Sequence, residues 1–179
     1  NLCVIRPADA NETSYAWRAA MLRTQGPTML VLTRQGLPVV ARGRLAGPDG
    51  LLKGAYVLSK ENADTPDIIL IASGSEVHLI LAAQQQLANA GIAARVVSMP
   101  SWELFHEQPA SYRNEVLPPG VKARLAVEAG SPLGWREWVG DAGEVVAVGK
   151  FGASAPGKEI FKHYGFTVEH IVERAKDLL

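Results

Sequence analysis

The chain has a single cysteine, Cys3, among its 179 residues. One thiol cannot form an internal disulfide, and the four histidines are scattered singly, without a recurring ligand spacing. A disulfide framework and a Cys/His zinc site are therefore not available to this chain. Such sparse cysteine is typical of a protein of the reducing cytoplasm.

An excess of charge of either sign is also missing, because lysine plus arginine and aspartate plus glutamate number 18 each. A neutral chain has no global field that attracts nucleic acid or an acidic membrane surface, and we expect neither partner. No apolar run approaches the roughly 20 residues that span a bilayer. The first residues lack the basic, then apolar, then small-residue order of a secretion signal. The sequence thus favours a cytoplasmic location.

What the chain does contain is the composition of a folded α/β protein, with 47% hydrophobic and 20% charged residues. Its length allows either one good core or one domain plus part of another, and we favour the second. The apolar, strand-like segment Asn1–Ile5 begins the chain without an initiator methionine. We interpret this start as a cut through a larger polypeptide.

A strand–helix–strand pattern is predicted for the first 35 residues. Asp9 is placed to cap a helix that runs to about Arg23, and Glu12, three residues on, is its capping-box partner. Gly26-Pro27 ends that helix. The apolar run that follows, at about residues 28–33, predicts a buried parallel strand.

The rest of the chain divides into a linker and a second α/β unit. Glycine-rich turns from Gly36 to about Asp67 predict a linker around one small strand at Ala55–Leu58. Strands then alternate with helices, which favours a mostly parallel sheet covered on both faces. Strands are predicted at about residues 67–72, 93–98, 123–128 and 144–148, and helices near residues 76–89, 102–106, 110–116, 133–139, 156–164 and 168–178.

Arg34 is the leading candidate for a functional residue, because it follows the predicted strand at 28–33. Ligands of open α/β sheets collect at the carboxyl ends of strands, and a guanidinium offers planar, bidentate donors to an anion such as phosphate. The alternative is that Arg34 pairs with a nearby carboxylate and has no other role. Gln35 could add a hydrogen bond or satisfy the backbone, and we assign it no role.

Two further turns carry polar groups at strand ends. The turn Ser73-Gly-Ser75-Glu76 could hold an anion at a helix N-terminus, but a simple cap by Ser75 is favoured because Glu76 would repel a phosphate. Glu128 could act as an acid or base, but no histidine or second carboxylate is adjacent, so a structural contact is favoured. Trp135 and Trp138 are expected to form a packing face, either internal or between subunits.

Seven segments of the chain together carry a family resemblance: Arg6–Asp9, Leu32–Pro38, Gly54–Leu58, Ala72–Val77, Ala94–Phe105, Val127–Gly130 and Phe151–Pro156. In order and spacing they resemble the carboxyl-terminal third of transketolases. The resemblance implies that residues 1–60 are the end of a pyrimidine-binding domain with its linker, and that residues 65–179 are the C-terminal domain. It also implies a three-layer α/β/α sandwich with a mixed, mainly parallel sheet, in which one strand is antiparallel.

The implied activity is that of the full-length enzyme in the pentose phosphate pathway, where a two-carbon ketol unit passes from a ketose phosphate to an aldose phosphate. The resemblance implies thiamine diphosphate and a divalent metal, magnesium or calcium, in a cytoplasmic homodimer. It places the substrate's terminal phosphate on the arginine of Thr33-Arg34-Gln35, although family members often have asparagine where this chain has Gly36. Catalytic, cofactor-binding and metal-binding residues are expected outside this chain, so the fragment alone should be inactive and bind no cofactor.

Two alternatives remain open at this point. The chain could be a stand-alone interaction module that docks to a separate catalytic subunit. It could also belong to another thiamine diphosphate enzyme, such as dihydroxyacetone synthase, 1-deoxyxylulose-5-phosphate synthase or the β subunit of a 2-oxoacid dehydrogenase. The segments at 98–101 and 151–154 resemble transketolase more than the last two.

Overall fold

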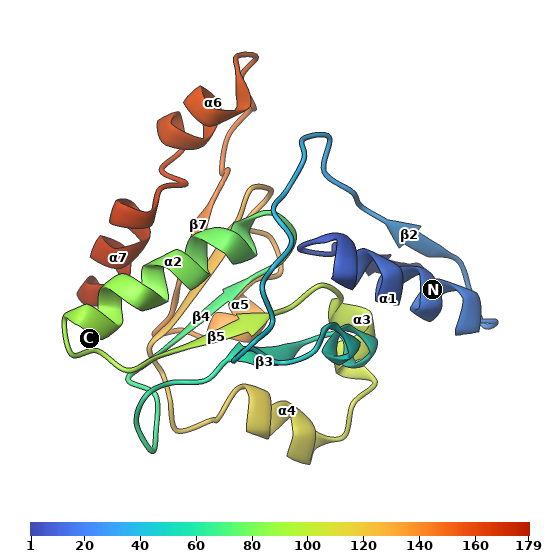
Figure 1. Cartoon of the computed structure of the whole chain (residues 1–179), viewed down its shortest axis with the longest axis horizontal. Coiled ribbons are helices and arrows are strands. Elements are labelled where there is room, and N and C mark those ends of the chain that lie inside the picture. The colour runs from blue at the N-terminus through green and yellow to red at the C-terminus, as the bar shows by residue number, and fades with distance from the viewer.

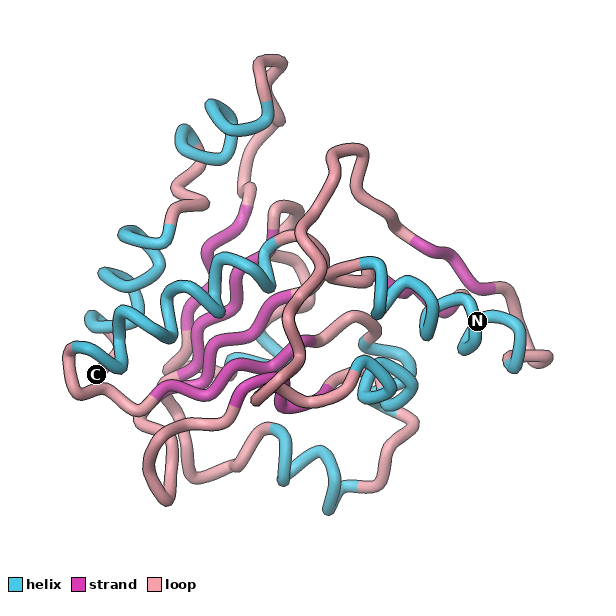
Figure 2. Tube along the Cα trace, viewed as in Figure 1, coloured by secondary structure: helices cyan, strands magenta, loops and turns pink.

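A five-stranded sheet forms the centre of the protein in a computed structural model that describes residues 1–179 (Figures 1 and 2). The strand order is β3-β5-β4-β6-β7. All five residues of β4 are buried, as expected for a strand with a neighbour on each side and helices on both faces. The strands are β3 (Tyr56–Ser59), β4 (Ile68–Ala72), β5 (Ala94–Ser98), β6 (Arg124–Glu128) and β7 (Glu144–Ala147).

Helices cover both faces of this sheet. Because side chains alternate along a strand, Ile68 and Leu70 of β4 pack on one face and Ile69 and Ile71 pack on the other. The first face is covered by α2 (Glu76–Asn89) and α7 (Val168–Asp177), and the second by α3 (Trp102–His106), α4 (Ala110–Val116) and α5 (Arg136–Val139). The short α6 (Gly157–His163) precedes α7. None of the helices is long and apolar enough to cross a membrane.

This arrangement confirms the predicted three-layer α/β/α sandwich. β4, β5, β6 and β7 run parallel, whereas β3 pairs with β5 in the antiparallel sense, with Tyr56 opposite Ser98. The predicted packing role of the tryptophans is confirmed as well, because Trp135 and Trp138 are buried against Trp102 and Phe105. The rings of Trp102 and Trp135 meet edge to face, with centroids 5.1 Å apart.

A second, smaller sheet is formed by β1 (Cys3–Ile5) and β2 (Thr28–Leu30), which pair in parallel and are joined by α1 (Ala10–Leu22). The prediction of a buried strand over residues 28–33 is wrong in two respects. The strand ends at Leu30, and Met29 is 50% exposed. The physical reason is that β2 has only β1 as a neighbour in this chain, so its other edge and one of its faces are uncovered.

The linker before β3 contains an element that the sequence analysis missed, a 3-10 helix (η1) at Pro48–Lys53. It ends at Gly54, whose φ of 81° lies in the left-handed region. A Cβ atom built on Gly54 would lie 2.1 Å from the backbone nitrogen of Phe105. Glycine is therefore required here for two reasons, its backbone conformation and the close approach to α3.

The two sheets are joined by a buried carboxylate on α1. Asp9 caps α1 as predicted, since its side chain accepts a hydrogen bond of 2.7 Å from the Glu12 N–H. The carboxylate of Glu12 is fully buried and accepts hydrogen bonds from the Tyr56 hydroxyl at 2.6 Å and from the Ser98 Oγ at 2.9 Å. The backbone N–H of Ala8 donates a third, at 2.8 Å. Burial raises the pKa of Glu12, and these three donors oppose that change.

Candidate functional site

Arg34 lies on an exposed bend beyond the end of β2, four residues past Leu30. The bend is held locally, because the Thr33 hydroxyl donates a hydrogen bond of 3.0 Å to the carbonyl oxygen of Gln35. Arg34 takes part in none of the ion pairs of the structure. The alternative role considered for Arg34, pairing with a nearby carboxylate, is therefore not seen within this chain.

Arg34 faces a cleft of about 890 Å³, which we call the Arg34 cleft. One wall is the bend at residues 34–36, and the other is formed by α6 and the turn into α7. Figure 1 shows the loop that follows β2 rising on the same side of the molecule as α6. Lys158 and Lys162 of α6 also line the cleft, whereas no aspartate or glutamate does.

The Arg34 cleft thus presents three cationic side chains, and neither lysine takes part in an ion pair. Apolar contact surface comes from Leu79, Phe161 and Phe166. A small anion with an apolar or polyol body, such as a phosphate ester, matches this combination of charge and shape. Sequence reasoning found Arg34 but not the lysines, because their side of the cleft comes from a segment more than 120 residues away along the chain.

The other two turns singled out in the sequence are brought together by Arg6, which follows β1. Its guanidinium forms an ion pair of 2.6 Å with Glu76 and a second one with Glu128. It also donates a hydrogen bond of 3.1 Å to the Ser73 Oγ, and that hydroxyl donates one of 2.8 Å to Glu128. A structural role for Glu128, favoured from the sequence, agrees with these contacts.

Ser75 does not cap α2 in the way that the sequence analysis favoured. It occupies the N-cap position, but its side chain makes no capping hydrogen bond and donates instead to the Glu76 carboxylate. The physical reason is that Glu76 is fully buried and needs donors. Burial raises the pKa of Glu128, the charge of Glu76 raises it further, and the Arg6 guanidinium opposes this.

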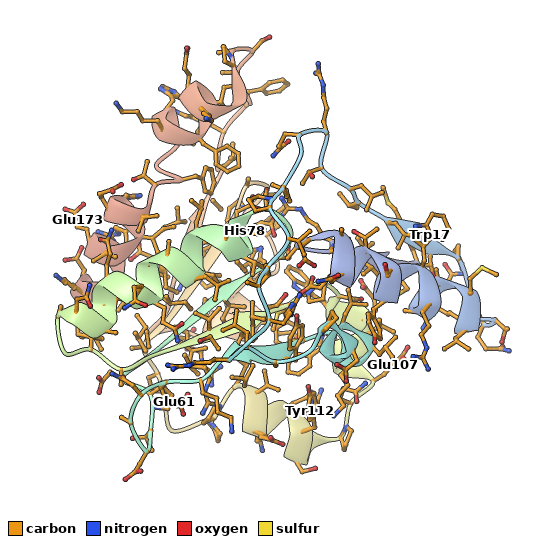
Figure 3. All side chains as sticks on the ribbon, in the orientation of Figure 1. Trp17, Glu61, His78, Glu107, Tyr112 and Glu173 are labelled. Carbon is orange, nitrogen blue, oxygen red and sulfur yellow. The ribbon has the colours of Figure 1, made fainter.

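The histidines lie apart from one another. His78 stands near the amino-terminal end of α2 (Figure 3), and its Nε2 is 3.2 Å from the carbonyl oxygen of Ala8. His106 contacts Glu137, and His170 contacts the Gly165 carbonyl. No group of three or more histidine, cysteine, aspartate or glutamate side chains is arranged to hold a metal ion.

Comparison with known proteins gives a consistent result. A family model described as the transketolase-like TK C-terminal domain matches residues 54–167. A transketolase of Geobacillus stearothermophilus is 54% identical over 179 residues, which are 100% of this chain and 27% of that protein.

Solved structures of transketolases are similar to this chain over nearly its whole length. The transketolase of Leishmania mexicana has a TM-score of 0.90 at 39% identity, over 99% of this chain and 25% of that one. A Pichia stipitis transketolase in complex with sedoheptulose-7-phosphate has a TM-score of 0.89 at 41% identity, again over 99% of this chain and 25% of that one. The chain therefore spans about a quarter of the length of these relatives.

Proposed function

Since the chain belongs to the transketolase family through its C-terminal domain, we propose that it is the carboxyl-terminal portion of a thiamine diphosphate-dependent transketolase. The full-length enzyme transfers a two-carbon ketol unit from a ketose phosphate to an aldose phosphate in the pentose phosphate pathway. Residues 1–60 form the end of a pyrimidine-binding domain with its linker, and residues 65–179 form the C-terminal domain. The separate β1-β2 sheet and the five-stranded sheet support a chain of two parts, although β3 (Tyr56–Ser59) already belongs to the five-stranded sheet, which therefore begins before residue 60.

The cofactor and its magnesium or calcium ion are assigned to the rest of the protein. The resemblance places the cofactor-binding residues in parts of the family's proteins that this chain, which spans about a quarter of its relatives' length, does not cover. Thiamine diphosphate supplies the electron sink for the ketol carbanion, whereas a protein part such as this one binds and orients substrate and excludes water. The 179-residue chain by itself should therefore catalyse no ketol transfer, and measurable transfer by the isolated chain would contradict this proposal.

The contribution of this chain to the substrate site is Arg34, which binds the terminal phosphate of the sugar. The observation that carries this proposal is the Arg34 cleft, where a guanidinium without an ion-pair partner faces a space of about 890 Å³ that no carboxylate lines. A guanidinium that binds the terminal phosphate, at the other end of the sugar from the reacting carbonyl, positions the substrate as well as tightening its binding.

Exposed apolar side chains support a place for this chain in a larger assembly, which we propose to be a cytoplasmic homodimer. Trp17, Met21 and Leu22 of α1 are all more than half exposed, and Met21 is 78% exposed. Figure 3 shows Trp17 on the outer side of α1, away from the large sheet. Large apolar side chains gathered on one helix mark a surface for contact with another domain or subunit.

We expect Arg34→Ala in the full-length enzyme to raise KM for phosphorylated ketoses by about 10- to 100-fold, because a charge-assisted bidentate contact contributes about 1.5–3 kcal/mol. The KM for unphosphorylated ketol donors should change far less, since they have no terminal phosphate. Steady-state kinetics with both classes of donor measures the difference.

The matched control is Arg44→Ala, because Arg44 is an exposed arginine that lines none of the main cavities and forms no ion pair. It should leave both KM values unchanged. If Arg34→Ala raised KM equally for phosphorylated and unphosphorylated donors, the phosphate assignment would be wrong while the transketolase activity itself would still stand.

A further inference from the structure

A second cavity lies at the carboxyl ends of the central strands, and we call it the strand-end cavity. It has a volume of about 360 Å³ and is lined by residues that follow β4, β5 and β6, among them Ser73, Met99 and Gly130. It shares no lining residue with the Arg34 cleft.

The sheet topology indicates that the strand-end cavity lies where ligands commonly bind. From β4 the chain proceeds to β5 on one side of β4 and then to β6 on the other side. The order of strands therefore reverses at β4, and ligands of open α/β sheets bind in the crevice outside the strand ends at such a switch point. The strand-end cavity occupies that crevice.

Its walls combine aromatic rings with carboxylates. Trp102, Trp135 and Met99 provide the apolar part, and Glu103, Glu128 and Arg6 provide the charged part. The edge-to-face contact of the two indoles and their packing against α5 hold the aromatic wall in place. An apolar pocket with a few convergent polar groups is the ordinary form of a small-molecule site.

The balance of charge in this cavity is negative. The single guanidinium, Arg6, is already paired with both Glu76 and Glu128. Glu103 forms no ion pair and accepts hydrogen bonds only from the Val4 N–H at 3.1 Å and the Ser101 Oγ at 3.2 Å. Two carboxylates and one guanidinium thus line the cavity; Glu128 is paired with Arg6, whereas Glu103 forms no ion pair.

We propose that the strand-end cavity binds a small organic cation, in which an amidinium or primary ammonium group lies against Glu103 and a planar body lies against Trp102. A cation beside an indole face and a carboxylate gains from both, and a flat body fills the space between the aromatic wall and the strand ends.

Isothermal titration calorimetry of the native protein that contains this chain tests the proposal with three probes of one shape. Benzamidine is cationic, benzamide neutral and benzoate anionic. Benzamidine should bind at least about tenfold more tightly than either of the others, because only it supplies the missing charge. Equal affinity for the three probes, or no binding of benzamidine, would overturn the proposal.

Two variants locate the binding. Glu103→Gln keeps an acceptor oxygen for the Val4 N–H but removes the charge, and it should weaken benzamidine binding about fivefold. Ser131→Trp places a large side chain at the exposed rim of the cavity and should abolish binding without touching the Arg6 ion pairs. The control is Glu173→Gln on the distant α7, where Figure 3 shows Glu173 at the far side of the molecule. Binding that survives both cavity variants would place the probe elsewhere and refute the assignment.

Discussion

Replacing Arg6 by methionine should lower the free energy of unfolding by about 3–5 kcal/mol, the range measured when one partner of a buried ion pair is removed. The reason is that Glu76, which is fully buried, and Glu128 would lose their only cationic partner. Methionine keeps most of the apolar length of the arginine side chain, so the loss reports on charge rather than on volume. Urea denaturation of the variant and the natural sequence, fitted with one m-value for both, measures the change in the free energy of unfolding.

The stability lost on Arg6→Met should become smaller as the pH falls. Burial already raises the pKa of Glu128 above the ordinary value of 4.5 in the natural sequence, and loss of the opposing Arg6 guanidinium should raise that pKa further. Groups with raised folded pKa values contribute full stability below the unfolded pKa and lose it as the pH rises. The difference in the free energy of unfolding between the variant and the natural sequence should therefore narrow as the pH falls toward 4.5.

The control for Arg6→Met is Arg174→Met. Arg174 also pairs with two carboxylates, Glu144 and Asp177, but these pairs lie at the surface. Water and salt screen exposed pairs, so this change should cost far less stability than Arg6→Met. Losses of equal size in the two variants would show that burial of the Arg6 cluster adds nothing to the stability of the fold.

Gly54→Ala is expected to lower the free energy of unfolding by about 4 kcal/mol, the sum of backbone strain and overpacking. The φ of 81° at Gly54 is unfavourable for alanine. In addition, the new Cβ would lie 2.1 Å from the Phe105 nitrogen and 2.4 Å from the Ser101 oxygen, which are backbone atoms and cannot rotate away. Thermal or denaturant unfolding measures the change.

Gly91 provides the matched control, because it ends α2 with nearly the same φ, 79°, but has no atom within 4 Å of an added Cβ. Gly91→Ala should therefore cost only the conformational part, about 1 kcal/mol. The difference between the two alanine variants isolates the cost of the clash with α3. A similar loss in both would mean that the loop at Gly54 shifts freely and does not fix α3.

The central layer of the fold could be predicted from the sequence because its signals are local. The Ile68–Ala72 run is bounded by turn residues, and the helix that ends before Gly91 was placed at residues 76–89, where the structure has it. β2 was predicted too long, since an apolar run does not reveal how many neighbours a strand has. The 3-10 helix at Pro48–Lys53 was missed because proline, aspartate and glycine in succession also suit a simple turn.

The two cavities could be predicted only in part, since both are assembled from distant segments. Arg34 was recognisable from its position after an apolar run, but Lys158 and Lys162 carry no local signal. Arg6 stands out in the sequence only as part of the segment Arg6–Asp9, and no residue near it in the sequence indicates that Glu76 and Glu128 are its partners. The sequence separation between Arg6 and Glu128 is 122 residues, and only the parallel sheet brings them together.

The hydrogen bonds of Glu12 have a consequence for the construction of chimaeric enzymes. Its carboxylate accepts hydrogen bonds from the Tyr56 hydroxyl on β3 and the Ser98 hydroxyl on β5, so α1 and the large sheet meet at a buried polar seam. A hybrid that joined residues 1–60 of one parent to residues 65–179 of another would take Glu12 and Tyr56 from the first parent and would need Ser98, or another donor at that position, from the second. A parent with an apolar residue in place of Ser98 would remove one of the two hydroxyl donors to the Glu12 Oε1, so exchangeable modules are defined here by hydrogen-bond partners rather than by linker position.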